Sequence, residues 1–151
     1  MTGGGELRWA VKDSFLHYVR DIAAGTTRLS DGARQEDDGT FSWPLVSATR
    51  ADDQLRLVFG GSVRFTAHGG FLDVDLRDPR LVLTDHSGSL SIAGEGAVER
   101  VVIASVDPAP GTDAADALIP LLTAAGAELF GGVYTVATAF APLVARIPLH
   151  S

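Results

Sequence analysis

Apolar and polar residues alternate along most of the chain, which is the pattern of β-strands that bury one face. The clearest run covers residues 54–67, where the apolar side chains that share one parity are Leu55, Leu57, Phe59, Val63 and Phe65. Inside this run, Gly60-Gly61 predicts a bulge or a close approach of two backbones. Turn clusters rich in Gly, Asp and Pro separate further alternating runs at 7–12, 25–33, 39–49, 71–79, 80–84, 89–93, 98–106, 133–140 and 143–149.

Two segments depart from this alternation and predict short helices. In the first, the apolar side chains recur at the spacing i, i+3, i+4 and i+7, which are Phe15, Tyr18, Val19 and Ile22. This spacing predicts a helix of about three turns, capped by Asp13 or Ser14 and followed by Gly25. The second segment, residues 123–132, has Thr123 at the cap position and Gly131 after the last turn.

These patterns predict a mainly β protein, namely an antiparallel β-sandwich or flattened barrel with two short α-helices. The chain has 151 residues and no internal repeat or linker, so we expect a single domain over residues 1–151.

Composition excludes several classes of function. The formal net charge is −7 and the arginines are scattered, so neither nucleic acid nor a membrane is expected as a partner. Cysteine is absent, which excludes disulfides, thiolate catalysis and cysteine-ligated zinc or iron–sulfur sites. No leader segment and no run of roughly 18 apolar residues is present. We therefore expect a cytoplasmic protein as written, or one of the cell envelope or exterior if the sequence is a piece of a longer one.

Few side chains are suited to chemistry. The chain has two tyrosines, Tyr18 and Tyr134, and His68 ends the strongest strand beside a Gly-Gly pair. From the residues alone, Tyr18 is either a core tyrosine with a backbone partner or a residue whose oxygen holds a ligand. His68 is likewise a turn residue or a site residue, and Tyr134 a packed strand residue or a site residue.

No motif of a known enzyme class is present. The chain lacks a nucleophile-elbow serine, a zinc-protease helix and a phosphate-binding loop, so we expect no enzyme. Asp73 and Asp75 share one strand face and are predicted to point to solvent, because the opposite parity buries Leu72, Val74 and Leu76.

Four segments resemble the HtaA-type haem-binding domain of actinobacterial haem-uptake proteins. They read "LRWAVKDSFLHYV" at 7–19, "DGTFSWPLVS" at 38–47, "GSVRFTAHGGFLDVDLRDPRLVL" at 61–83 and "LTAAGAELFGGVYTVATAFAPL" at 122–143. The most specific pieces are the opening W-x-V-K-x-S-F-x-x-Y and the later F-T-x-H-x-G. The resemblance extends in order and spacing over nearly the whole chain.

The resemblance implies a β-rich domain that binds one haem. In the family a tyrosine of the opening helix holds the iron, and this residue corresponds to Tyr18. A histidine hydrogen-bonded to that tyrosine corresponds to His68. A serine one turn before the ligand and a tyrosine near the C-terminus lie close to the propionates, and they correspond to Ser14 and Tyr134.

The walls of the implied site are less well matched. Where the family usually carries an aromatic residue that stacks on the porphyrin, this chain has Val133. The candidate porphyrin walls are Phe15, Phe65, Phe71 and Phe130.

The implied ligand is ferric haem b, because a phenolate oxygen is a hard anion that prefers Fe(III) to Fe(II). The implied function is haem uptake, transfer or storage, with haem, other haem-carrier proteins or a haem transporter as partners. Two alternatives stay open: a peroxidase-like or haem-degrading enzyme that uses His17 or His86, and a haem-free interaction module. The oligomeric state, monomer or homodimer, also stays open.

Overall fold

The structure is a computed structural model that describes residues 5–22, 24–67, 69, 72–84, 87–94, 100–108 and 118–147. Its elements are β1 (Glu6–Trp9), α1 (Asp13–His17), the π-helical η1 (Tyr18–Ile22), β2 (Thr26–Ser30), β3 (Arg34–Gln35), β4 (Phe41–Ala51), β5 (Gln54–Phe59), β6 (Ser62–Ala67), β7 (Leu72–Arg77), β8 (Arg80–Leu83), β9 (Gly88–Ala93), β10 (Arg100–Pro108), β11 (Leu118–Leu122), α2 (Ala124–Leu129) and β12 (Leu143–Arg146).

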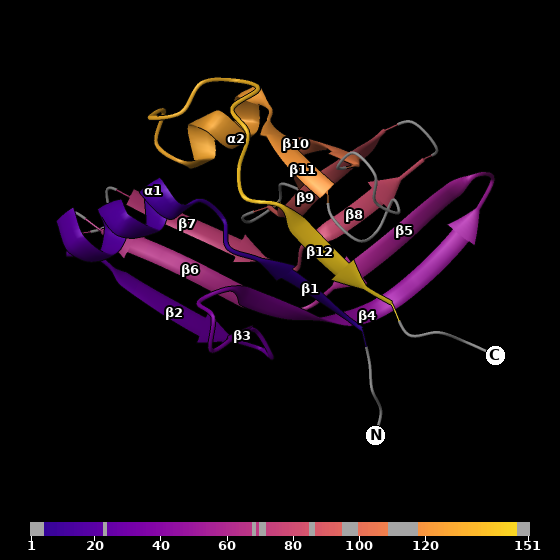
Figure 1. The fold of residues 1–151 in the computed structure, drawn as a ribbon, viewed down its shortest axis with the longest axis horizontal. Coiled ribbons are helices and arrows are strands. Elements are labelled where there is room, and N and C mark those ends of the chain that lie inside the picture. Colours follow the sequence, from indigo (N-terminus) through magenta and orange to yellow (C-terminus); the bar gives the residue numbers. More distant parts are fainter. Residues whose placement is uncertain are drawn as a thin grey trace.

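Eight antiparallel strands form a closed barrel, in the order β1-β12-β11-β10-β9-β8-β5-β4 (Figure 1). The ring closes at β1, because Leu7 lies opposite Ala145 of β12 on one edge and opposite Trp43 of β4 on the other. The short β3 adds to β4 outside the ring. The mainly β prediction is confirmed, and of its two alternatives the structure is a closed barrel and not a sandwich. Alternation reveals which face of a strand is buried and does not reveal whether the end strands of a sheet meet.

A separate three-stranded sheet, β2-β6-β7, lies next to α1 and η1 (Figure 1). The chain leaves the barrel for this sheet at Gly60-Gly61, between β5 and β6. Gly61 has a φ of 114°, and a Cβ atom there would lie 2.8 Å from the backbone nitrogen of Ala33. The predicted close backbone approach is therefore confirmed, and the alternating run 54–67 is two strands of two different sheets.

The first predicted helix spans the expected residues but differs in its details. Lys12 occupies the N-cap position, and no side chain caps the helix. The predicted cap at Asp13 or Ser14 is wrong, because the Ser14 hydroxyl is engaged by the distant Tyr134 hydroxyl instead. At the other end, Ala24 adopts the left-handed φ of 50° that we expected of Gly25.

The second half of this helix is π-helical, which changes the direction of its side chains. A π-helix closes i→i+5 hydrogen bonds and so turns less per residue than an α-helix. Phe15 and Val19 are buried as predicted, but Ile22 is 65% exposed. The prediction that Ile22 lies on the buried face is therefore wrong, since it assumed an α-helical period throughout.

The second helix, α2, matches its predicted capping. The Gly126 N–H donates to the Thr123 hydroxyl at 3.0 Å. After the helix, Gly131 has a φ of 84°, and the Gly132 N–H donates to the Ala127 carbonyl at 2.9 Å. This is the Schellman arrangement that a glycine favours.

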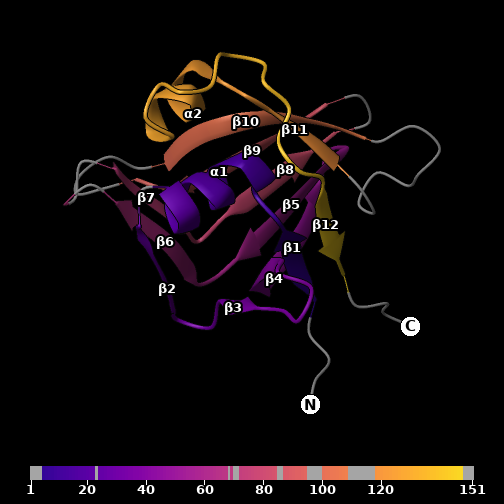
Figure 2. The same cartoon turned by 60° about the vertical axis from the view of Figure 1, so that its left-hand side comes forward.

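Residues 130–142, which follow α2, form a loop and not the strand predicted over 133–140. We call this segment the C-terminal loop. Only one isolated bridge forms within it, between Leu121 and Ala139. Figure 2 shows the loop on the same side of the molecule as α1.

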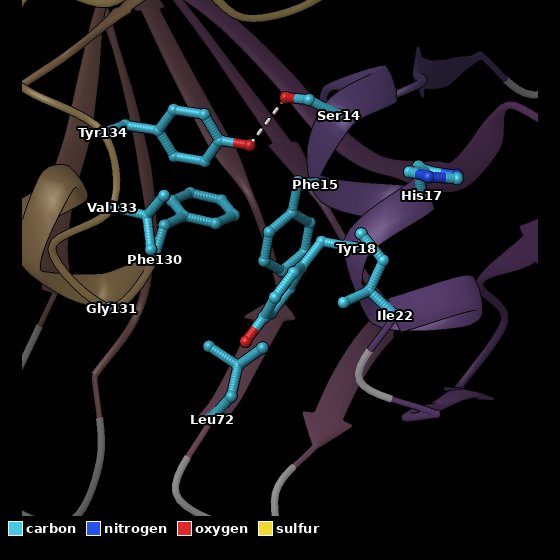
Figure 3. Close-up of a pocket in the computed structure, with 10 residues that line it drawn as sticks. All are labelled: Ser14, Phe15, His17, Tyr18, Ile22, Leu72, Phe130, Gly131, Val133 and Tyr134. Carbon is cyan, nitrogen blue, oxygen red and sulfur yellow. Dashed lines mark hydrogen bonds between the residues drawn. The ribbon is translucent and has the colours of Figure 1, made fainter.

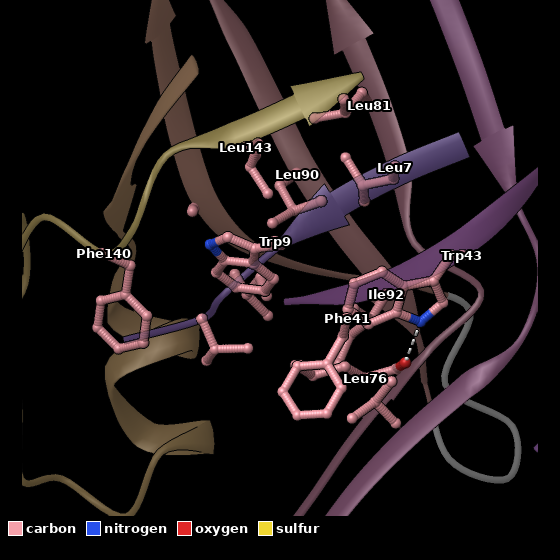
Figure 4. Packing of buried hydrophobic residues seen from close by; sticks show 14 of the residues in the cluster. Leu7, Trp9, Phe41, Trp43, Leu76, Leu81, Leu90, Ile92, Phe140 and Leu143 are labelled. Carbon is pink, nitrogen blue, oxygen red and sulfur yellow. Dashed lines mark hydrogen bonds between the residues drawn. The ribbon is translucent and has the colours of Figure 1, made fainter. Parts of the chain in front are cut away.

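The core fills the barrel and continues under the three-stranded sheet. Trp9 and Trp43 pack at a centroid distance of 6.5 Å, and each indole N–H donates to a backbone carbonyl, that of Ala141 and that of Leu76 respectively (Figure 4). These bonds satisfy the polar edge of each buried indole. The predicted inward parity is confirmed, since Leu57, Phe59, Val63 and Phe65 are fully buried.

Candidate functional site

A cavity of about 600 Å³ lies between α1/η1 and the C-terminal loop (Figure 3). We call it the Tyr18 cavity. Its lining residues are Ser14, Phe15, His17, Tyr18, Ile22, Leu72, Phe130, Gly131, Val133 and Tyr134. Its size falls within the range of about 300–1,000 Å³ usual for small-molecule sites. Six of the nine residues that the sequence analysis named for the site line this cavity. Phe65 does not, and His68 and Phe71 lie outside the described residues.

Tyr18 lies where α1 passes into η1, and its half-buried ring spans the cavity. Figure 3 shows its hydroxyl pointing toward Leu72, at the opposite end from the hydroxyls of Ser14 and Tyr134. The helical segment contacts β6, and the chain that follows it approaches this strand closely, because a Cβ atom on Gly25 would lie 2.4 Å from the Thr66 carbonyl oxygen. Tyr18 is therefore held by a segment that packs closely against a strand.

The hydroxyls of Ser14 and Tyr134 form a hydrogen bond of 2.8 Å across the cavity rim, with either oxygen as the donor (Figure 3). These residues are 120 positions apart in the chain. Ser14 comes from α1, one turn before Tyr18, and Tyr134 comes from the C-terminal loop. The edge of the Tyr134 ring meets Phe140 at a centroid distance of 5.1 Å, which steadies the ring from behind.

The deeper walls are aromatic and aliphatic. Phe15 and Phe130 are both buried and meet edge to face at 5.0 Å. Phe65 packs behind Phe15 at 5.2 Å and does not line the cavity, so it is a core residue. Phe71, the other candidate wall, lies outside the described residues.

Beside the two hydroxyls, the rim carries apolar side chains that are open to solvent. Val133 is 73% exposed and Ile22 is 65% exposed, and the two face each other across the opening (Figure 3). Ile22 and Leu72 are lining residues that the sequence patterns assigned to the core and not to a site. Only the resemblance, which covers the segment containing Leu72, offered a signal for that residue.

The titratable side chains of His17 and Asp21, next to the cavity, pair with each other in contact with solvent. The His17 Nδ1 lies 2.9 Å from the Asp21 carboxylate, and the His17 side chain is 61% exposed. Within the described part of the chain, no group of three or more His, Cys, Asp or Glu side chains could hold a metal ion.

Two carboxylates with a lowered pKa, those of Asp38 and Asp73, lie outside the cavity lining. Hydrogen bonds from Thr40 lower the pKa of Asp38, and hydrogen bonds from Arg64 lower that of Asp73.

The prediction for the acidic strand face is confirmed only in part, because Asp75 is half-buried and accepts a hydrogen bond from the Ser62 hydroxyl, and Leu72 is half-buried as a lining residue of the cavity. Asp73 is exposed and pairs with Arg64, while Val74 and Leu76 on the opposite parity are buried.

As for membranes, none of the described helices has the length and apolar character needed to cross a bilayer.

Comparison with known proteins matches the chain to one family. The model of the HtaA family (Htaa) matches residues 4–146. The N-terminal domain of HtaA from Corynebacterium glutamicum is 26% identical, with a TM-score of 0.81 over 100% of this chain and 99% of that chain. The C-terminal domain of the same protein is 25% identical, with a TM-score of 0.80 over 95% of this chain and 94% of that chain.

A more distant structural match is the haem-binding protein HtaB from Corynebacterium glutamicum. It is 20% identical, with a TM-score of 0.69 over 95% of this chain and 91% of that chain, and this likeness concerns the fold alone. No curated protein matches the chain significantly.

Proposed function

The chain belongs to the HtaA family, and we propose that it binds one haem in the Tyr18 cavity, with the Tyr18 oxygen as the axial ligand of ferric iron. The observation that carries the proposal is the cavity, which combines apolar aromatic walls with a single phenol inside and a pair of hydroxyls at its rim. The fold is also that of a haem-binding protein, HtaB.

The lining suits the two chemical halves of a haem. A porphyrin is a flat apolar ring, and Phe15, Phe130 and Leu72 offer it an apolar surface. Its two carboxylates need hydrogen-bond donors or water, and the Ser14 and Tyr134 hydroxyls lie at the open rim. A haem seated with its carboxylates toward this rim would leave its apolar body against the deeper walls.

Tyr18 is the lining residue best suited to the iron. The described lining contains two phenols. The Tyr134 oxygen lies at the rim beside Ser14, whereas the Tyr18 oxygen points toward Leu72 at the opposite end (Figure 3). Ferric iron favours the deprotonated phenol because it supplies a neighbouring positive charge. We propose His68, which follows β6 directly, as the residue that hydrogen-bonds to the ligand oxygen. Because phenolate prefers Fe(III), reduction would favour release, which suits a protein that hands haem on.

A carrier is favoured over an enzyme by the position of His17. A peroxidase-like or haem-degrading reaction needs an acid–base group that faces the haem. His17 is one of the lining residues, but its side chain is 61% exposed and its Nδ1 is engaged by Asp21, while His86 lies outside the described residues. Product analysis of the haem-loaded protein with peroxide or a reductant tests this choice, since a modified porphyrin or turnover of a peroxidase substrate would favour the enzyme.

The test of the proposal is a titration with ferric haem followed by absorbance. The variants are Tyr18→Phe, which removes only the ligand oxygen, and Tyr18→Ala, which removes the ring as well. We expect the wild-type protein to give a saturable one-to-one Soret shift with a charge-transfer band typical of tyrosine ligation. Both variants should lose that band.

The control is Tyr134→Phe, which removes the other phenol oxygen and should keep the tyrosine-ligated spectrum. A Tyr18→Phe protein with the wild-type spectrum would show that Tyr18 is not the ligand. If the wild-type protein gives no Soret shift at all, the haem proposal fails and the haem-free interaction module takes its place. A haem donor, a haem acceptor, a homodimer and the cytoplasmic location stay predictions.

A further inference from the structure

We propose that Lys12 is a positioning residue, whose charged side chain holds the C-terminal loop against α1 and so places the Tyr134 hydroxyl opposite Ser14. The importance of this role for haem rests on the proposed function. Its geometry rests on contacts that exist without any ligand.

Lys12 is the only lysine of the chain, and its ammonium group is directed at the C-terminal loop. Its Nζ donates to the Ala139 carbonyl at 3.1 Å. The same atom lies 5.8 Å from the centre of the Tyr134 ring and 5.6 Å from that of Phe140. A cation at this distance from an aromatic ring is attracted to it, so one ammonium group joins three residues of the loop.

The backbone beside Lys12 supports the same contact. The Val11 carbonyl accepts a hydrogen bond from the Ala141 N–H at 2.8 Å, and the Trp9 indole donates to the Ala141 carbonyl at 2.8 Å. Val11 is fully buried and has a φ of 61°, a conformation that a β-branched residue rarely adopts. Such a conformation persists only where its surroundings impose it. Residues 9–12 therefore form a conformationally constrained segment that binds residues 139–141 through backbone and side-chain hydrogen bonds.

A lysine is also unfavourable at the N-cap position that Lys12 occupies. Lys12 is the N-cap of α1, where the free N–H groups and the helix dipole favour a Ser, Thr, Asp or Asn side chain. Lys12 makes no capping bond and places a positive charge at the positive end of the helix. A residue that opposes its local preference is expected where another role requires it, and the contacts with the loop supply that role.

The consequence concerns the rim of the Tyr18 cavity. The backbone of Lys12 begins the helix that carries Ser14, since its carbonyl accepts the Leu16 N–H at 3.0 Å. Its side chain meets the loop that carries Tyr134. Lys12 thus contacts both segments that supply the 2.8 Å hydrogen bond between Ser14 and Tyr134. Loss of the charge would remove the side-chain contacts that hold the Tyr134 ring toward Ser14, while the backbone hydrogen bonds at Ala141 would remain.

The first measurement uses the protein without haem. Incorporation of 3-fluorotyrosine labels the chain at only two positions, Tyr18 and Tyr134, and Tyr134→Phe assigns the two fluorine signals. We expect Lys12→Met, which keeps the stem and removes the charge, to shift or broaden the Tyr134 signal. Lys12→Gln should act in the same way, and Lys12→Arg should restore the wild-type signal. Arg28→Met, which removes an exposed charge on β2, is the matched control and should change neither signal.

The second measurement is the rate at which ferric haem passes from the loaded protein to an excess of an apo-globin. We expect about tenfold faster release from Lys12→Met, the size of effect appropriate to losing a cation–aromatic contact and a charge-assisted hydrogen bond. Lys12→Arg should stay within about threefold of the wild type, because a guanidinium can make both contacts.

The two measurements separate the two proposals. A displaced Tyr134 signal in Lys12→Met supports the role of Lys12 even if the wild-type protein binds no haem. An unchanged Tyr134 signal in both Lys12→Met and Lys12→Gln overturns that role, whether or not haem binds. A displaced signal that Lys12→Arg does not restore also overturns it, since the charge would then not be what holds the loop.

Discussion

Gly126→Ala should raise the helix propensity of α2 but create a steric clash, and we expect the clash to dominate and lower the stability of the protein. Gly126 lies inside α2, where alanine is favoured over glycine by about 1 kcal/mol. A Cβ atom at this position would, however, lie 2.0 Å from the carbonyl oxygen of Ile103. Carbon and oxygen normally stay more than about 3.3 Å apart, so the helix would have to move away from β10.

The cost of this movement follows from what anchors the helix. Ile103 lies at a bulge of β10, between Val102 and Ala104, and its carbonyl accepts the Thr123 N–H at 3.0 Å. The Thr123 hydroxyl also donates to the Val102 carbonyl at 2.6 Å. Overpacking costs about 1–3 kcal/mol, and weakening one of these hydrogen bonds adds about 1 kcal/mol. After the gain in helix propensity, we expect a net loss of about 2 kcal/mol.

Thermal unfolding measures this prediction. For a chain of this size, a loss of about 2 kcal/mol lowers Tm by about 4–8 °C. The matched control is Ala125→Gly, at the exposed neighbouring position of the same helix, where only propensity changes and Tm should fall by about 2–4 °C. Because Phe130 follows α2 and forms a cavity wall, Gly126→Ala should also weaken haem binding. A Gly126→Ala protein as stable as the wild type, or more stable, would refute the reasoning.

Two further predictions concern the cavity rim and the acid stability of the fold. Val133→Phe adds a ring at the rim and should tighten haem binding by about 3–10-fold, the range of one aromatic contact worth about 0.5–1.5 kcal/mol. Val136→Phe, on an exposed loop valine outside the lining, should leave the affinity unchanged, and equal effects of the two variants would contradict the idea. Arg64→Met should raise the pKa of Asp73 toward its ordinary value, because hydrogen bonds from Arg64 lower it. The ion pair therefore stabilises the fold above about pH 4 and loses its effect as the pH falls below that value, by at most about 0.5 kcal/mol for this exposed pair. An NMR titration of Asp73 with the same midpoint in both proteins would show that the pair is not responsible.

Much of the local structure could be predicted because it depends on neighbouring residues. The alternation over 54–67 assigned the buried face of two strands correctly. Thr123 and Gly131 marked both ends of α2, because a cap and a left-handed residue act within a single turn. Ser14 and Tyr18 are four positions apart, which places them on one side of a helix.

Local patterns failed where a distant part of the chain competes for the same groups. The Ser14 hydroxyl suits a helix cap by its position, yet it bonds to Tyr134. Residues 133–140 alternate like a strand, yet their backbone follows contacts to Lys12 and β11. Ile22 is exposed and not buried, because residues 18–22 are π-helical and the α-helical spacing no longer applies there.

The sequence by itself thus determined which face of the strands at 54–67 is buried, where α2 begins and ends, and, through the family resemblance, several residues that line one cavity. Only the tertiary structure decided that the sheet closes on itself at β1 and that the C-terminal loop lies across α1 to form the Tyr18 cavity. The physical reason is the range of the interactions. Propensity and capping act over a few neighbouring residues, whereas strand closure and the Ser14–Tyr134 contact join segments more than a hundred residues apart, and many chains with the same local pattern would not bring them together.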